Sequence, residues 1–293
     1  MKTTAIIKIV LFSILTVFLT VFLMKNLNPI KFPTFRINSN LFNNQNQEII
    51  TGDYKKGSGN YNANDVTSMD INWVAGEVDI QEYDGTDIIF EEISNGISEK
   101  YKMHHTLSNG KLTINYSKSN SFNGFGFGVN IQKKNLTIKV PKNKRFEKIE
   151  LNIVGTETNI SNIKSQDMHF ITVNGDINGN NLTAKNLSGE SVSGQLNLTG
   201  DFNSIDYVSV SGKINITDTV CPEVIECESV SGSLNITIPE NDGFTLEYDK
   251  VSGYIDCDFE TKMIENRKLE HKNGSADFKF NTVSGEISIK KIK

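Results

Sequence analysis

The stretch ESVSGSLNIT, residues 228–237, recurs along the second half of this 293-residue chain with small changes. Its copies are ESVSGQLNLT (190–199), YVSVSGKINIT (207–217), DKVSGYIDCD (249–258) and NTVSGEISIK (281–290). A phrase that returns at a regular period is typical of a repeat architecture, whereas a catalytic centre is usually encoded once. The repeat therefore predicts how the chain is built more directly than what it binds.

Apolar residues recur at fixed offsets from the glycine of each repeat. Valine stands two residues before it and isoleucine or leucine two residues after it. Isoleucine or leucine also stands four residues after it, except at Gly179 and Cys257, and the residues between are mostly Ser, Asn or Thr. Alternation with a period of two predicts a half-buried β-strand. A further apolar column, seven residues before the glycine, is out of phase with the valines, so we expect a corner between the two columns. The glycine is expected on the inward face, where it permits a bend or a close approach by the next layer.

The spacing of the glycines gives the size of the repeating unit. Gly175, Gly194, Gly212, Gly232 and Gly253 follow one another at intervals of 19, 18, 20 and 21 residues. Thr156 takes the same place one step earlier, and the last interval, 32 residues to Gly285, predicts an insertion around residues 261–277. Coils of about 20 residues are too short for a strand, a crossover helix and a return. The predicted fold class is therefore all-β, a β-solenoid or parallel β-helix in which each coil pairs with the next along the chain.

The third position after the glycine supports this stacking. It is occupied in turn by Asn159, Asn178, Asn197, Asn215 and Asn235, and then by Asp256 and Ser288. Asparagines at one position of successive layers can form a ladder of hydrogen bonds. The ladder also explains the many N-x-[ST] matches better than glycosylation does, because strand alternation places Asn and Thr outward.

Residues 64–150 are rich in β-strand patterns but less regular than the solenoid repeats of residues 151–293. SNG at 108–110 predicts a hairpin turn. This section could continue the solenoid or form a small antiparallel cap, which an open solenoid end needs because unpaired strand edges promote aggregation. At the opposite end, Lys290, Lys291 and Lys293 are expected to protect the other edge.

An apolar segment opens the chain. Residues 5–24 carry one charge, Lys8, and a helix of that length spans roughly 30 Å, the thickness of a bilayer core. We expect an uncleaved transmembrane anchor over residues 1–24, because no small-residue cleavage site follows. Residues 25–63 are polar and predict a linker. The predicted location is the cell membrane, with a single span and an extracellular C-terminal domain.

Charge and cysteine content argue against two other classes of protein. The net charge of −5 gives no attraction for nucleic acid, which is not an expected partner. The three cysteines, Cys221, Cys227 and Cys257, match neither a disulfide framework nor a zinc site. Pairing of Cys221 with Cys227 stays open, and Cys257 is interpreted as a small buried apolar residue.

The sequence contains no recognised catalytic motif, and we predict no catalytic, metal-binding or cofactor-binding residues. His104 and His105 are interpreted as exposed strand residues that point to opposite faces. Parallel β-helices include polysaccharide-cleaving enzymes that use clustered carboxylates. Asp201, Asp206 and Asp218 could approach one another across coils, but acids beside Gly or Asn are typical of corners.

Two segments are candidates for surface binding. Phe125 and Phe127 share a face within SFNGFGFGVN (121–130), which could contact a membrane, a glycan or a protein, or could fold onto the cap. Residues 133–148 contain seven Lys or Arg and one Glu. Here Lys142, Lys144 and Arg145 could meet anionic lipids or wall polymers, although solvated turns are the alternative explanation.

The VSGxLNI repeats, LTIKVPKNKRFEKIEL (136–151) and the terminal NTVSGEISIK resemble the bacterial DUF4097 family, a β-strand-repeat, adhesin-like group. The resemblance covers about residues 65 to 293, and Thr156 and the stretched last coil depart from it. It implies a β-solenoid domain, often found in envelope-associated proteins and connected in some members with envelope stress. The family has no established catalytic motif, so no functional residue is carried over.

These patterns predict a membrane-anchored, non-enzymatic cell-surface β-solenoid, and the family resemblance implies that it acts as an adhesin-like or envelope-stress-associated interaction module. Its expected partners are the membrane, through the N-terminal helix, and a cell-wall polymer, a lipid or another envelope protein. Two alternatives stay open: a carbohydrate-active parallel β-helix enzyme, and a regulatory domain for a membrane partner.

Overall fold

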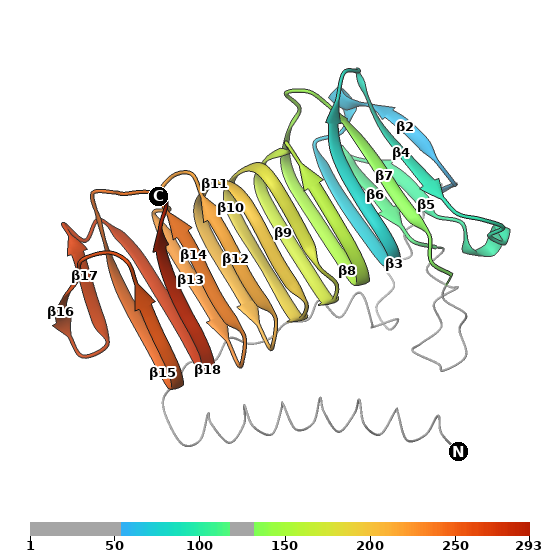
Figure 1. The fold of residues 1–293 in the computed structure, drawn as a ribbon. Coiled ribbons are helices and arrows are strands. Elements are labelled where there is room, and N and C mark those ends of the chain that lie inside the picture. Colours follow the sequence, from blue (N-terminus) through green and yellow to red (C-terminus); the bar gives the residue numbers. More distant parts are fainter. Residues whose placement is uncertain (1–53, 118–131) are drawn as a thin grey trace, which may run out of the picture. The chain divides into compact units, whose positions relative to one another are not determined.

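Short parallel β-strands stacked coil on coil form the body of this protein (Figure 1). The computed structural model describes residues 54–117 and 132–293, and their strands join into one sheet of 18 strands. The all-β solenoid prediction is confirmed for these residues. Within them, no helix has the length and apolar character needed to cross a bilayer, and the predicted anchor at residues 1–24 lies outside them.

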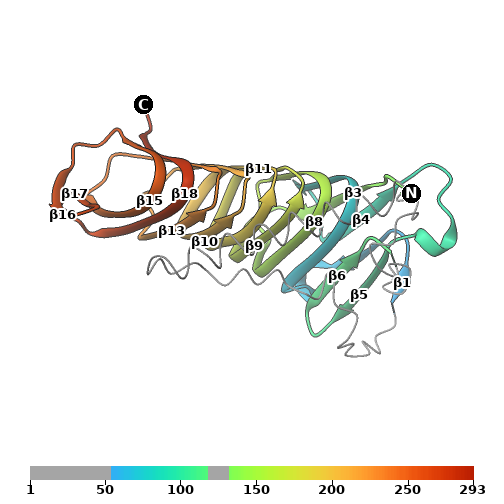
Figure 2. The same ribbon diagram turned by 90° about the horizontal axis from the view of Figure 1, so that it is seen from below.

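Each regular coil has two arms that meet at the repeated glycine. In the most regular coil, β13 (Val224–Ser229) is the first arm, before Gly232, and β14 (Ser233–Ile238) is the second arm, after it. The preceding coils are built in the same way from β9 (Lys164–Asn174), β10 (Ile177–Ser193), β11 (Gln195–Ser209) and β12 (Lys213–Asp218). First arms pair in parallel with first arms and second arms with second arms, so that Ile205 lies beside Ile225 and Ile214 beside Leu234. Figure 2 shows these coils side by side along the stack.

The corner lies at the VSG phrase itself, which corrects the predicted place of the valines. Val251, which follows Lys250, is exposed. The valines before the other glycines are only half-buried, whereas the Ser or Thr one residue before each of them is buried. That hydroxyl accepts the N–H of the glycine, from Gly212 to Ser209 at 2.9 Å and from Gly232 to Ser229 at 2.7 Å. A short side chain that bonds the backbone three residues ahead is a usual way to form a turn. The alternation therefore changes phase between the serine and the glycine.

The glycines allow the coils to approach closely, as predicted. A Cβ placed on Gly232 would lie 2.0 Å from the carbonyl oxygen of Gly212, and one on Gly194 would lie 2.4 Å from that of Gly175. Real atoms do not approach so closely, so any larger residue would push adjacent coils apart. Thr156 holds the corresponding place in its coil. It pairs with Gly76 of the coil before it, and a Cβ placed on Gly175 of the coil after it would lie 2.3 Å from the carbonyl oxygen of Thr156.

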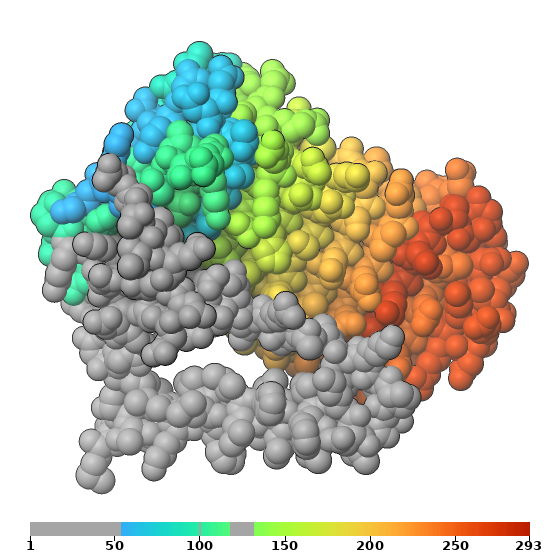
Figure 3. Space-filling model, turned by 180° about the vertical axis from the view of Figure 1, so that it is seen from behind, coloured from blue at the N-terminus to red at the C-terminus, as the bar shows by residue number. Residues whose placement is uncertain are grey.

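At the C-terminal end the spatial order of the coils departs from their order in the chain. After β14 the chain forms β15 (Gly243–Cys257), then a hairpin of β16 (Lys262–Glu265) and β17 (Lys268–Lys272), and finally β18 (Ala276–Lys291). β18 lies between the coil of β13 and β14 on one side and β15 on the other. Figure 3 shows this final segment as the reddest band, inside the end of the stack.

This insertion corrects two predictions. β15 does not pair with the coil before it in sequence, because β18 takes that place. Lys290 and Lys291 therefore do not protect an outer edge. They make ion pairs one coil inside the end, Lys290 with Asp256 and Asp258, and Lys291 with Glu240. The insertion predicted around residues 261–277 is confirmed as the β16–β17 hairpin.

The N-terminal section both continues the solenoid and caps it. β3 (Ser68–Tyr83) and β8 (Arg145–Ser161) are full coils that pair in parallel. Outside β3 lies a coil made of β6 (Lys111–Asn115) and β7 (Asn135–Pro141). Beyond these, β5 (His104–Ser108) covers β6 and β4 (Asp87–Ile93) covers β7, both antiparallel.

Two outermost strands complete this cap. β1 (Lys55–Lys56) pairs with β5, and β2 (Gly59–Asn62) pairs with β4. Short 3₁₀ turns occupy Ala63–Asp65 and Glu99–Tyr101. The predicted hairpin turn at 108–110 joins β5 to β6, with Asn109 and Gly110 at positive φ.

Candidate functional site: the outer faces of the coil stack

The outward side chains of the first arms form one continuous polar surface, which we call the charged face. Register places them in rows that cross β6, β3, β8, β9, β10, β11, β13 and β18. Its members discussed below are Asp70, Asn72, Lys111, Lys148, Glu150, Asn152, His169, Ser188, Glu190, Asp206, Glu226, Glu228, Lys279 and Asn281. Because each sits on a strand that is bonded on both sides, the spacing of these groups is set by the backbone ladder.

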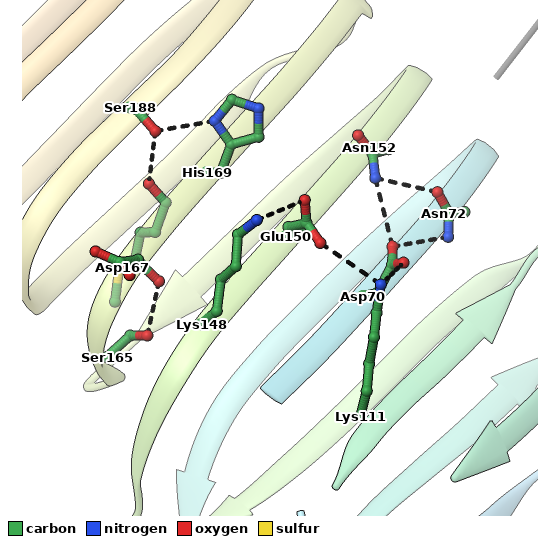
Figure 4. A network of polar contacts seen from close by, with 11 residues as sticks. Asp70, Asn72, Lys111, Lys148, Glu150, Asn152, Ser165, Asp167, His169 and Ser188 are labelled. Carbon is green, nitrogen blue, oxygen red and sulfur yellow. Dashed lines mark hydrogen bonds and ion pairs between the residues drawn. The ribbon is translucent and has the colours of Figure 1, made fainter. Parts of the chain in front are cut away.

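Opposite charges are paired in the part of the charged face nearest the N-terminal cap (Figure 4). Lys111 Nζ lies 2.7 Å from Asp70 and 3.6 Å from Glu150, and Lys148 Nζ lies 2.9 Å from Glu150. Partial burial opposes ionisation of Glu150, but the two lysines hold the pKa of this carboxyl below its usual value. This part of the surface is therefore electrically balanced.

Amides and a histidine extend the same network. Asn152 donates to Asn72 Oδ1 at 3.1 Å, and Asn72 donates to Asp70 at 2.9 Å. One strand further along, His169 Nδ1 lies 2.9 Å from Ser188 Oγ. Burial lowers the pKa of His169. Each side chain has a fixed partner, so this surface is preorganised.

The middle of the charged face is acidic instead. Glu190, Asp206, Glu226 and Glu228 follow one another on β10, β11 and β13. Burial raises the pKa of Glu190 and of Asp206, and a neighbouring carboxylate raises each further. Two of these acids have partners on β18: Lys279 forms an ion pair with Glu226 at 3.0 Å, and Asn281 donates a hydrogen bond to Glu228 at 2.9 Å. The charged face thus changes from balanced to acidic along the stack.

The outer face of the second arms carries the predicted asparagine ladder, which is confirmed. Each amide nitrogen donates to the amide oxygen of the preceding coil. The distances are 3.3 Å for Asn178 to Asn159, 3.0 Å for Asn197 to Asn178, 2.7 Å for Asn215 to Asn197 and 2.8 Å for Asn235 to Asn215. Every member from Asn178 to Asn215 both donates and accepts, so the ladder stiffens this face and leaves one N–H per amide for other contacts.

The sequence model of the Toastrack DUF4097 family matches residues 66–203 and 201–290. The chain belongs to the DUF4097 family. No curated protein matches it. Among solved structures, a candidate cell adhesion protein from Clostridium sporogenes is similar, with 10% identity, a TM-score of 0.40, and coverage of 82% of this chain and 100% of the other. A candidate adhesin from Bacteroides fragilis has 13% identity, a TM-score of 0.38, and coverage of 81% and 97%.

The basic residues singled out in the sequence lie close together in this DUF4097 domain: Lys142 and Lys144 in the turn between β7 and β8, and Arg145 at the first position of β8. Lys142 is exposed but ion-paired, with Nζ 2.9 Å from Asp84. Lys144 Nζ donates to the carbonyl oxygen of Ala63 at 2.6 Å, and burial lowers its pKa. Arg145 is exposed. Phe125 and Phe127 lie outside the described residues, so their predicted role stays a prediction.

Sequence reasoning missed a buried ion pair at the capped end of the DUF4097 domain. The ammonium of Lys134, at the corner between β6 and β7, is fully buried and bonds Glu92. It also donates to the carbonyl oxygens of Tyr101, at 2.6 Å, and Tyr116, which uses all three of its hydrogens. The ring of Tyr116 lies 4.2 Å away. No sequence signal marks this lysine among its neighbours, because only folding encloses it.

Other side chains that could carry chemistry are mostly structural. His104 and His105 are buried, which corrects their interpretation as exposed residues, and burial lowers the pKa of His105 to about 4. Asp218 is buried at a corner, accepts the N–H of Phe202 at 3.3 Å, and has its pKa raised to about 7 by burial. Asp201 adds to that shift. Asp206 lies on the charged face.

The cysteines form no disulfide, and the described residues offer no metal site. Cys221, Cys227 and Cys257 are all free thiols, so the open pairing of the first two does not form. Cys257 is only half-buried, against the edge of the core. In the part of the chain that the structure describes, no group of three His, Cys, Asp or Glu side chains could hold a metal ion.

Proposed function

We propose that this chain is a membrane-anchored, non-enzymatic interaction module that a bacterium displays on its outer face. Its work is binding by the outer faces of the coil stack, in an adhesin-like or envelope-stress-associated role. Membership of the DUF4097 family supports this proposal, and so does the anchor predicted at residues 1–24. An extended stack suits this role because every coil adds surface while the core keeps the stack stiff.

The charged face is the observation that carries the proposal. Near the cap, its side chains are held by one another before any partner arrives, so binding there would require little further ordering. Its acidic part, Glu190 to Glu228, favours a partner with positively charged groups, whereas the turn with Lys142 and Arg145 favours anionic lipids or wall polymers. The partner is therefore a cell-wall polymer, a lipid or another envelope protein that carries one of these charges.

Charge variants of the full chain test which surface binds. One variant replaces Glu190, Asp206, Glu226 and Glu228 by their amides, and a second reverses Lys142 and Arg145 while keeping Lys144, whose ammonium holds the cap. Binding to isolated walls and to vesicles with anionic lipids is measured for both. We expect one variant to lose binding and the other to keep it. Full binding by both variants would refute the proposal for these surfaces.

Display outside the cell is tested separately by adding protease to intact cells. A surface domain is degraded, whereas a domain that regulates a membrane partner from inside the cell survives until the cells are opened. Survival would favour the regulatory alternative.

An enzymatic function has one observation in its favour. Neighbouring carboxylates with raised pKa values, such as Glu190 and Asp206, are what polysaccharide-cleaving enzymes use as acid and base. Incubation of the full chain with envelope polysaccharides separates the two functions. Turnover that disappears in Glu190→Gln or Asp206→Asn would establish the enzyme, and binding without turnover would support the interaction module.

A further inference from the structure

The second arm of β15 is an open strand edge at the C-terminal end of the stack. On one side, residues from Ser252 to Cys257 pair with Ser284 to Ile289 of β18. On the other side, β17 pairs only with Gly243 to Glu247 of the first arm. In the described residues, the other second arms from β7 to β18 have a strand on each side. An unpaired edge of this kind is a template for another strand.

The direction of the backbone groups identifies what the edge offers. Asp258 N–H donates to Ile289 of β18 at 3.0 Å. Because neighbouring residues of a strand point their N–H and C=O groups to opposite sides, those of Ile255 and Cys257 face the open side. In the other coils, the carbonyl oxygen of the corner glycine faces the next coil. In Gly253 this oxygen instead accepts a hydrogen bond from Lys250 Nζ at 2.8 Å.

Exposed apolar side chains accompany this edge. Val251 is 59% exposed and Tyr254 is 57% exposed, both on β15. Met263 and Ile264 of the neighbouring hairpin are 67% and 39% exposed. Large apolar groups gathered at one end of a domain are typical of a surface that is covered by a partner.

We propose that the second arm of β15 pairs, antiparallel, with the same arm of a second copy of this chain, about a two-fold axis at Ile255. In this register Ile255 faces its own copy and Gly253 faces Cys257 across hydrogen-bonded pairs. Tyr254 then lies opposite Asp256, and Ser252 opposite Asp258. No two like charges lie directly opposite each other, and Lys290 makes an ion pair with each of the two acids. A shift of the axis to Asp256 would place that carboxylate against its own copy.

The shape of the stack explains why association stops at two chains. A two-fold pairing uses the same edge on both copies and leaves no free edge behind. The opposite end of the stack is covered on both arms by β4 and β5. Head-to-tail growth into a fibre would need an open edge at both ends. The dimer does not depend on what the outer faces bind.

A cross-linking experiment on the full chain in detergent tests the register. Ile255→Cys is made in a chain with Cys221→Ser and Cys257→Ser, so that buried Cys227 is the other cysteine left. The matched control is Lys213→Cys, which is exposed on a second arm in the middle of the stack. Under mild oxidation we expect the Ile255→Cys chain to form disulfide-linked dimers at least about tenfold faster than the control, because pairing raises the effective thiol concentration. Equal rates would overturn the proposed register.

A second measurement tests the pairing without a disulfide. Ile255→Pro removes an N–H that points to the open side and not to β18, so the β18 ladder is kept. Light scattering of the full chain should show a dimer for the natural sequence and a monomer for this variant, with similar circular dichroism spectra. A natural chain that is monomeric would overturn the proposal and leave the edge to a strand of a different protein.

Discussion

At the N-terminal end of the stack, β4 and β5 cover both arms of the outermost coil, whereas at the C-terminal end β17 covers only the first arm of β15. The same rule of construction lies behind both ends. In each, the outermost coil is not the one nearest the end of the chain, since β6 and β7 lie outside β3, and β15 lies outside β18. Strands that begin and finish the regular stack are thereby bonded on both sides and cannot fray singly.

The polar contacts at the two ends differ in the same way. The closed end contains the buried ammonium of Lys134 and the buried ring of His105, which lies 4.5 Å from Phe90. The open end carries exposed ion pairs such as Lys290 with Asp258. A buried charged group that loses its partner is left without solvation, which is costly, whereas an exposed charged group that loses its partner is solvated by water. The closed end should therefore be the more sensitive to substitution.

Loss of the buried ammonium should have the largest effect. Lys134→Met leaves Glu92 buried without its partner, and we expect the free energy of unfolding in urea to fall by about 3–5 kcal/mol. Adding Glu92→Leu should recover part of this loss, because no unpaired charge remains. A Lys134→Met chain as stable as the natural one would show that the ion pair does not support the cap.

Corner glycines at the two ends should respond unequally to the same change. A Cβ on Gly76 would lie 2.1 Å from Lys134 O, and one on Gly253 would lie 2.0 Å from Gly285 O. Gly76 is enclosed by coils on both sides, but β15 can move outward. We expect Gly76→Ala to cost about 3 kcal/mol or more and Gly253→Ala about 1–2 kcal/mol.

Gly155→Ala is the matched control for this pair, because a Cβ there would first meet Val74 O at 3.8 Å. Its expected effect on the melting temperature is small. Equal losses at Gly76 and Gly253 would contradict the idea that the open end can yield.

Acid should weaken the closed end through His105. The pKa of this side chain falls from 6.5 to about 4 on folding, mainly through burial. Between these values the unfolded chain binds a proton that the folded chain does not. Stability is therefore complete above pH 6.5 and decreases as the pH falls towards 4, by about 3 kcal/mol at most. Urea unfolding at a series of pH values measures this, and His105→Phe should remove that part of the dependence.

Removal of an exposed lysine at the open end should have the smallest effect. Lys290 Nζ lies 3.1 Å from Asp258, and the two side chains are 39% and 40% exposed. We expect Lys290→Met to change stability only slightly, and the difference to shrink further in high salt. A loss comparable to that of Lys134→Met would mean that the open end depends on this lysine for its structure.

The regular coils could be predicted because their information is local. Isoleucine and leucine after each glycine alternate with polar residues, and the asparagines at the third position bond their neighbours as expected. The valines were wrongly predicted to point inward, because the set of residues that point inward changes where a strand turns a corner. The hydrogen bond from the N–H of Gly212 to Ser209 places that corner between the serine and the glycine. Two alternating patterns on either side of a turn do not say where between them the phase changes.

The candidate site could be predicted only in outline. Lys142, Lys144 and Arg145 are close together in sequence, at the turn before β8 and its first residue, but Asp84 and Ala63, which hold two of them, are distant in sequence. The acidic part of the charged face is spread over residues 190–228, at one or two acids per coil. It becomes a cluster only when the coils are stacked in register.

By itself, the sequence of this protein determined the length of the coil, the inward isoleucines and leucines after each glycine and the ladder of asparagines, because these depend on residues a few positions apart. Tertiary structure alone decided the order in which the last coils stack. Every VSG coil presents nearly the same edge to a neighbour, so β14 could pair equally well with β15 or β18, and the 32 residues between Gly253 and Gly285 are long enough for either. Whether β15 or β18 pairs with β14 depends on which order leaves fewer strand edges unpaired at the ends of the stack, and that is a property of the whole stack.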